Sequence, residues 1–316
     1  MMRERASGLA QSVYDRLKAM ARATDRPFAE VLELYAVERF LHRLGTSPHR
    51  DVFVLKGATL LRSWLGADSR PTRDVDLLGS PDLDEPAFRQ ILLDILREDV
   101  EVDGIDYEDA SIAIRPIREK SAPLGLRAKF DGYLGRTHVR YQVDVGFGDH
   151  VFPPPVEFAP EAFLDLPIAS LRAYTPYTTV AEKLEAMVVL GRANSRTKDY
   201  YDLLQLPRTL AFDGATLAEA IRRTFARRER RIPPEPVEGL ADDFASEPLQ
   251  ATRWRTFLRK NRLEVTVTDF LEVVARIRRF AQPALDAARD GGAFDRRWPA
   301  GGPWQPDPDG GGRDGG

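Results

Sequence analysis

The sequence predicts an α+β protein in which a mixed sheet covered by helices is followed by a helical half. Three observations lead to this fold class. Short apolar runs of strand type are concentrated between residues 51 and 147, a proline-rich segment spans 151–176, and helical periodicity dominates 178–289. Strands mixed with helices, followed by helices alone, are typical of an α+β domain joined to a second domain.

Length and composition agree with two domains. A chain of 316 residues exceeds what one compact core usually holds. With 43% hydrophobic and 30% charged residues and no long apolar run, it reads as a soluble globular protein without a membrane span. The start lacks the apolar stretch of a secretory signal. The absence of cysteine excludes thiolate metal sites and fits a cytoplasmic location, and four histidines argue against a histidine-rich zinc centre.

The N-terminal region, residues 1–46, is expected to form two amphipathic helices. Apolar residues recur at helical spacing in 7–24 and in 27–45, for example Leu32 and Phe40. We expect these helices to cover the domain that follows.

Residues 47–172 are expected to form the core. A short apolar strand (51–56), a helix ended by a glycine (57–66) and a second strand (72–79) make a β-α-β unit. Another helix follows. The remaining strands are separated by Gly and Pro signals and lie in the segments SIAIRPI, LRAKFDGYLG and THVRYQVDVGFG.

The second half, residues 173–290, is expected to be a helical domain. The prolines before it are typical of a crossing segment rather than of an element interior. Five helices are predicted, around residues 178–193, 197–206, 215–231, 249–262 and 268–289. The last stretch, 291–316, is half glycine and proline, with 13 of 26 residues, and is therefore predicted to be disordered.

Three aspartates form the strongest candidate for a catalytic site. Alternation along a strand puts Asp74 and Asp76 on one face, and Asp144 on a later strand points away from its valine neighbours. Adjacent carboxylates repel each other unless a cation compensates, and Mg²⁺ prefers such oxygen ligands. Three acids are able to hold two metal ions for phosphoryl transfer. A pair of acids on a strand is also, and more often, only a solvated polar face.

A turn upstream offers a phosphate-binding feature. Lys56, Gly57 and Ala58 lie where a strand passes into a helix, so backbone N–H groups and the positive helix end are available to phosphate oxygens. The alternative is an ordinary strand-to-helix turn, and the spacing of a Walker loop is absent. A strand, a turn, a helix and an acidic strand in this order are rarer together than any one of them alone, which favours the functional interpretation.

A lysine and two acids in the helical half form a second candidate cluster. Lys183 lies beside the apolar stripe of a helix whose N-cap is expected at Thr178 or Thr179. It is able either to reach a triphosphate or to pair with neighbouring acids. Asp199 and Asp202, three residues apart, share one face of the next helix.

Five short motifs, in order over about residues 50–205, resemble the AbiEii/AbiGii family of nucleotidyltransferase toxins, including its MenT-like branch. They are LKGATLL, RPTRDVDLLG, QVDVGFGD, AEKLEAMV and NSRTKDYYDL. The resemblance implies a DNA polymerase β-like nucleotidyltransferase fold and the toxin role in a type IV-like toxin–antitoxin pair. It also implies Mg²⁺ and an NTP substrate, CTP or UTP being favoured, with the 3′ acceptor end of tRNA as the target.

The same resemblance assigns roles to residues. Asp74 and Asp76 match the metal-binding pair, and Asp144 matches a less firmly assigned third acid. Lys183 matches a lysine expected on the NTP phosphates. Its acidic partner is Asp199, with Asp202 as the other candidate.

Two further positions bear on regulation and on the NTP loop. Thr72 occupies a Ser/Thr position that some antitoxins phosphorylate, and a dianion there would compete with the triphosphate for Mg²⁺. The cognate antitoxin is accordingly expected to be a winged-helix protein of AbiEi type or a kinase-like protein. Ala58 departs from the commoner second glycine of the family turn.

Arginines in the helical half are candidates for RNA contact. Residues 222–231 contain six arginines in ten positions, and 259–262 and 276–279 add more. Such runs suit a phosphate backbone, although a solvated helix face has the same composition. With a net charge of −3, RNA binding requires these clusters to lie on one side. The competing hypotheses are transfer to a protein or small-molecule acceptor, and a catalytically inactive binding module.

Overall fold

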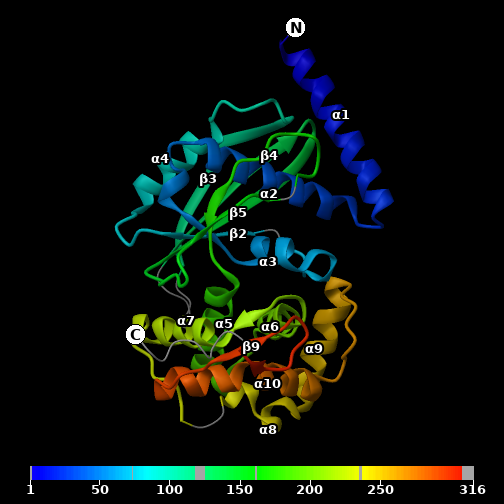
Figure 1. Cartoon of the computed structure of the whole chain (residues 1–316). Coiled ribbons are helices and arrows are strands. Elements are labelled where there is room, and N and C mark those ends of the chain that lie inside the picture. Colours follow the sequence, from blue (N-terminus) through cyan, green and yellow to red (C-terminus); the bar gives the residue numbers. More distant parts are fainter. Residues whose placement is uncertain (1, 73, 118–124, 161, 235–236, 308–316) are drawn as a thin grey trace. The chain divides into compact units, whose positions relative to one another are not determined.

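The computed structural model (Figure 1) describes residues 2–72, 74–117, 125–160, 162–234 and 237–307. The chain divides into two compact units. The first, here called the sheet unit, comprises Met1–Ser63, Pro71–Gly148 and Val156–Ala173. The second, the helical unit, comprises Trp64–Arg70, Asp149–Pro155 and Tyr174–Gly316.

The sheet unit contains a seven-stranded mixed sheet with the order β3-β4-β5-β2-β1-β7-β6. Its central strands β2 and β5 run parallel, as do β1 and β7, and the other neighbours are antiparallel. The bounds are β1 Val54–Lys56, β2 Asp74–Gly79, β3 Ile105–Ile117, β4 Gly125–Leu134, β5 Thr137–Phe147, β6 Val156–Phe158 and β7 Leu171–Ala173. The mixed sheet expected from the sequence is confirmed, and the unit β1-α3-β2 joins antiparallel strands.

One face of this sheet is apolar and is covered by helix α2. Alternation places Phe130 on the same face as Val75, Val143 and Val145, which are at most 1% exposed. Phe40 of α2 contacts Phe130 with 5.9 Å between ring centroids. Residues of opposite parity on β2 and β5, the aspartates among them, therefore point away from α2. The helices of this part of the chain are α1 Met2–Ala23, α2 Phe28–Thr46, α3 Ala58–Leu65 and α4 Glu85–Leu96.

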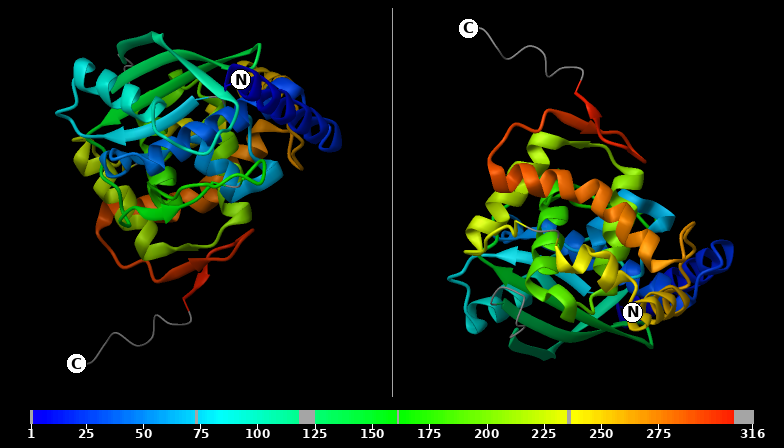
Figure 2. Two further views of the ribbon diagram at one scale, coloured as in Figure 1. Left: turned by 90° about the horizontal axis from the view of Figure 1, so that it is seen from above. Right: turned by 90° about the horizontal axis from the view of Figure 1, so that it is seen from below.

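The helical unit is built around helices α5, α6, α7 and α10, which pack on one another. A small sheet with the order β10-β9-β8 lies beside them, and its C-terminal strands follow α10 in red in Figure 2. The bounds are α5 Pro176–Leu190, α6 Thr197–Thr209, β8 Phe212–Asp213, α7 Gly214–Arg227, α8 Asp242–Ala245, α9 Pro248–Asn261, α10 Phe270–Asp290, β9 Arg296–Trp298 and β10 Gln305–Pro306. Throughout the described part of the chain, no helix is long and apolar enough to cross a bilayer.

The unit boundaries differ in detail from those expected. The N-terminal helices belong to the sheet unit, because the buried side of α2 packs on β5 and β7. Two short segments far apart in sequence join the helical unit through hydrogen bonds. Tyr201 donates its hydroxyl to the carbonyl of Asp68 at 2.6 Å, and Thr178 donates to the carbonyl of Phe152 at 2.9 Å. The N-cap of α5 is Thr175 rather than Thr178 or Thr179, because Pro176 suits the first helical position.

The expectation that residues 291–316 are disordered is wrong for 291–307. Trp298 is only 5% exposed and donates its indole N–H to the carbonyl of Pro207 at 2.8 Å. The ring of Trp304 stacks on Phe280 with 5.7 Å between centroids. The buried Trp298 and the half-buried Trp304 supply the apolar area that a count of glycine and proline overlooks. Residues 308–316 lie outside the described residues.

Candidate active site

Asp74, Asp76 and Asp144 lie on the face of the central strands that is turned away from α2. In the parallel pair β2 and β5, Asp76 is the register partner of Asp144, and Asp74 is the partner of Gln142. Partners on neighbouring parallel strands point to the same face, with strands about 4.8 Å apart. The structure therefore brings the three predicted acids together on adjacent strands. Asp74 and Asp76 are half-buried, within reach of solvent.

The predicted turn lies directly against Asp76. Gly57 has a φ of +78°, which favours glycine. A Cβ atom added there would lie 2.0 Å from Oδ2 of Asp76, so a side chain does not fit. Lys56 is the register partner of Asp76 on β1, and Ala58 begins α3. The turn is thus fixed by backbone conformation and by a close approach to the carboxylate.

Asp144 has a cationic partner that the sequence did not suggest. Arg127 on β4 donates from Nε to Oδ1 at 2.8 Å and from Nη2 to Oδ2 at 2.7 Å. Gln142 adds a contact of 3.3 Å to Oδ2. Both oxygens of the third acid are therefore engaged in a bidentate ion pair. The signal was available in the strand register, where Arg127 faces Asp144 directly.

The donor chemistry of this face suits a hard divalent cation at Asp74 and Asp76. Both carboxylates come from one strand, and oxygen is the ligand atom that Mg²⁺ prefers. Within the described ranges, no group of three or more His, Cys, Asp or Glu side chains is arranged to hold a metal ion. This agrees with the engagement of Asp144 by Arg127. Thr72, just before β2, is half-buried, and its hydroxyl lies 3.4 Å from the carbonyl of Asp74.

In the helical unit, Lys183, Asp199 and Asp202 form one buried cluster. Helix α5 buries Val180 and Leu184 completely, and Lys183 emerges at the edge of this stripe with 12% of its side chain exposed. Its Nζ donates to Oδ1 of Asp199 and to Oδ2 of Asp202, both at 2.7 Å. The two candidate acids therefore share the lysine, and neither is its sole partner.

Two arginines complete the cluster, and sequence reasoning missed both. Arg70 donates from Nε to Oδ1 of Asp202 at 3.0 Å, and Arg196 donates from Nε to Oδ2 of Asp199 at 2.6 Å. The second contact has the i,i+3 spacing of a helix pair and was detectable in the sequence. The first joins residues 132 apart, which no local pattern reveals. Three cations thus surround two buried carboxylates.

The ion pairs of this cluster stabilise the charged forms of Lys183 and Asp199. Burial alone lowers the pKa of Lys183, but the carboxylates of Asp199 and Asp202 outweigh it and raise that pKa above its usual value. Burial raises the pKa of Asp199, yet Lys183 and Arg196 together lower it to about 2. At neutral pH Lys183 is therefore protonated and Asp199 is ionised.

The dense arginine run of α7 is largely engaged within the helical unit. Arg222 and Arg223 pair with Glu219, and Arg228 pairs with Asp149 and Glu185. Fewer arginines of residues 222–231 are therefore available to bind a phosphate backbone than the composition indicated.

The family comparison agrees with these features. The model of the AbiEii family, described as nucleotidyl transferase AbiEii toxin of type IV toxin–antitoxin systems, matches residues 39–286. A Helicobacter pylori protein assigned as a nucleotidyltransferase is 12% identical with a TM-score of 0.44, covering 82% of this chain and 95% of its own. The H. pylori protein JHP933 has the same identity and TM-score, covering 81% and 91%. No curated protein matches. The family model extends over most of the sequence, including both acidic strands and the lysine cluster, and the chain therefore belongs to the AbiEii family of nucleotidyltransferase toxins from type IV toxin–antitoxin systems.

Proposed function

We propose that this toxin is a Mg²⁺-dependent nucleotidyltransferase that adds pyrimidine nucleotides from CTP or UTP to the 3′ acceptor end of tRNA. Translation stops because an extended acceptor end cannot be aminoacylated. The observation that supports the proposal most directly is the register of β2 and β5, which pairs Asp76 with Asp144 beside the Gly57 turn. We place the activity in the cytoplasm, where tRNA and NTP are found.

In the proposed reaction, a 3′ hydroxyl oxygen of the acceptor bonds to the α-phosphorus of the NTP. The bond from this phosphorus to the bridging oxygen of the β-phosphate breaks, pyrophosphate leaves, and the hydroxyl proton passes to a carboxylate or to water. Asp74 and Asp76 would hold the metal, which supplies charge neutralisation and lowers the pKa of the hydroxyl when bound. Asp144 joins them as a ligand only if the metal replaces Arg127 as its partner. Otherwise Asp144 holds the guanidinium of Arg127 on the same face of the sheet.

The remaining residues are assigned to the nucleotide. In this proposal the backbone N–H groups of Gly57 and Ala58 bind phosphate oxygens, and Lys56 contributes charge beside them. We assign Lys183 to the NTP phosphates, with Asp199 and Asp202 holding its ammonium protonated and in place.

Control of the enzyme is proposed to act through an antitoxin. Thr72 is half-buried two residues before Asp74, so a phosphate on its hydroxyl would place a dianion next to the metal ligands. A kinase-like antitoxin would act in this way, whereas a winged-helix antitoxin of AbiEi type would act without modifying Thr72. Mass analysis of the toxin after co-expression with its antitoxin separates the two, because phosphorylation adds a fixed mass to one peptide.

The proposal is tested by incubating the purified protein with total RNA, Mg²⁺ and each labelled NTP in turn. Label should enter tRNA from CTP or UTP, and sequencing of RNA 3′ ends should locate the added nucleotides. EDTA and Asp74→Ala should each abolish the incorporation, with the variant still folded by circular dichroism. If the label enters protein or a small molecule instead, the acceptor is that molecule and not tRNA. If Asp74→Ala stays as toxic to cells as the parent, the protein acts by binding alone.

A further inference from the structure

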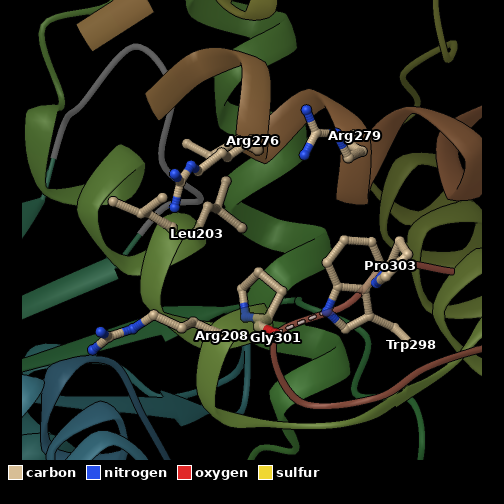
Figure 3. A pocket seen from close by; sticks show the side chains of 10 residues that line it. Leu203, Arg208, Arg276, Arg279, Trp298, Gly301 and Pro303 are labelled. Atoms are coloured by element: carbon tan, nitrogen blue, oxygen red, sulfur yellow. Dashed lines mark hydrogen bonds between the residues drawn. The ribbon is translucent and has the colours of Figure 1, made fainter. Parts of the chain in front are cut away.

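A small pocket in the helical unit has a lining that contains none of the candidate aspartates and no lysine, although two of its arginines belong to the run 276–279. It has a volume of about 260 Å³ and is enclosed by α6, α10 and the segment that follows β9. Figure 3 shows Arg276 and Arg279 extending from α10 on one side, Arg208 on another, and the ring of Trp298 beside Pro303. The volume is below that of a drug-sized site, so the pocket suits a small ligand.

The walls of the pocket are held in place by the C-terminal segment. The carbonyl of Pro207 accepts hydrogen bonds from the indole N–H of Trp298 at 2.8 Å and from the backbone N–H of Gly301 at 2.9 Å. A Cβ atom on Gly302 would lie 2.3 Å from the Trp298 ring, so this glycine packs directly on the indole. The C-terminal segment, which was predicted to be disordered from its composition, therefore forms an ordered wall of the pocket.

The lining combines apolar surface with positive charge and contains no acidic residue. The apolar part consists of Leu203, Leu204, Pro207, Ile277, Trp298 and Pro303. The charged part consists of three arginines in a protein whose net charge is −3. A ligand that satisfies both parts carries an anionic group and a flat apolar body.

The three arginines differ in how they are engaged. Arg208 pairs with Asp68 and Arg276 pairs with Glu272, and all four of these side chains are 41–48% exposed. Exposed ion pairs of this kind contribute little, so both guanidinium groups are able to turn towards a ligand. Arg279 is exposed, and the part of the chain that the structure describes gives it no ion pair or hydrogen bond. It is the natural primary ligand for an anion.

We propose that this pocket binds a nucleotide, with the phosphate on Arg279 and its neighbouring arginines and the base against the apolar wall. Guanidinium groups bind phosphate through paired N–H donors and also stack on planar rings, and the exposed Pro303 and half-buried Leu204 offer the base apolar surface. The nucleotide comes either as a free mononucleotide or as a unit of single-stranded RNA. The site uses none of Asp74, Asp76 or Lys183, so it goes beyond the proposed catalytic function.

The experiment is isothermal titration of the full-length protein with CMP, cytidine, inorganic phosphate and a short single-stranded RNA. CMP should bind, cytidine should bind at least tenfold more weakly, and Arg279→Gln should weaken CMP binding about tenfold. Leu204→Glu, which places a negative charge in the lining, should weaken it by at least as much. Arg255→Gln removes an exposed arginine of α9 outside the pocket and should leave binding unchanged.

The outcomes separate the source of the ligand from the existence of the site. Tighter binding of RNA than of CMP, lost in Arg279→Gln, assigns the pocket to RNA, and the reverse assigns it to free nucleotide. Equal binding of CMP and cytidine, parent-like binding by Arg279→Gln, or no binding of CMP or RNA overturns the inference. The Asp74→Ala variant should bind CMP as the parent does. Loss of binding in this variant would place the nucleotide at the carboxylate face, which overturns the pocket and leaves the proposed function standing.

Discussion

The two clusters of aspartates in this protein differ in how deeply their carboxylates are buried. On β2 of the sheet unit, Asp74 and Asp76 are half-buried on the face turned away from α2. On α6 of the helical unit, Asp199 and Asp202 are each 1% exposed and are held by Lys183, Arg196 and Arg70. Asp144 is intermediate, since it is 15% exposed and pairs with a single arginine.

The difference indicates what each cluster is built for. Carboxylates that are buried among cations have their charge balanced by the protein itself, and removing one partner is costly. Carboxylates that remain within reach of solvent depend less on partners in the protein, because water solvates them as well. We therefore expect substitutions on β2 to affect activity with little loss of stability, and substitutions around Lys183 to affect both.

The largest expected effect is that of Asp76→Ala on activity. Loss of a metal ligand should reduce nucleotide incorporation by about a thousandfold or more, because the charge of the triphosphate is no longer compensated. The unfolding midpoint should fall less than in a variant of the fully buried Asp199 and Asp202, because Asp76 is only half-buried. Incorporation of labelled NTP and thermal unfolding measure the two quantities. Asp106→Ala, an exposed acid on β3, is the matched control and should leave both unchanged. A large fall in the midpoint of Asp76→Ala would contradict the division between the clusters.

The next effect concerns stability in the helical unit. Lys183→Met removes the cation shared by Asp199 and Asp202, and we expect a loss of about 3 kcal/mol in the free energy of unfolding. Arg196 and Arg70 still partner the two acids, which keeps the loss at the lower end for a buried ion pair. Urea unfolding measures it. Lys183→Arg retains the charge and should lose less. A Lys183→Met protein as stable as the parent would show that the network has no structural role.

Gly57→Ala tests the turn beside Asp76. The φ of +78° is strained for alanine, and the added methyl group overlaps Oδ2 of Asp76, so the carboxylate must move. We expect a loss of about 1–3 kcal/mol of stability and a fall in incorporation of about a hundredfold. The matched control is Gly66→Ala, which also has positive φ, at +57°, but has open space around the added Cβ. This control variant should lose stability but keep the nucleotide incorporation of the parent. Equal activity of Gly57→Ala and the parent would remove the turn from the site.

The sequence predicted these clusters unequally well, for a physical reason. Strand alternation placed Asp74 and Asp76 on one face, and helical periodicity placed Asp199 and Asp202 together, because both patterns are local. The partners Arg127 and Arg70 come from chain segments brought close only by folding. A single sequence contains no local signal for such pairs unless the strand register is already known.

The C-terminal segment teaches the same lesson about composition. Glycine and proline predicted disorder through residues 291–316, since a segment poor in apolar residues seldom buries enough area to remain ordered. Trp298 and Trp304 reverse this because two rings pack around Phe280 and donate their indole N–H groups to backbone carbonyls. Two large side chains therefore determine the structure of this segment more than its average composition does.

The smallest expected effect is the pH dependence contributed by Asp199. Its pKa is lowered from 3.8 to about 2 in the folded protein, so the ion pair contributes stability that is fully present above about pH 4. That contribution is lost as the pH falls from about 4 to about 2, and it amounts to about 2 kcal/mol. Urea unfolding of the parent and of Asp199→Asn should therefore give free energies that converge as the pH is lowered through this window. Asp106→Asn controls for general acid effects on an exposed carboxylate. A difference that stays constant down to about pH 2 would mean that Asp199 is not ionised in the folded cluster, and the contrast with the acids of β2 would then disappear.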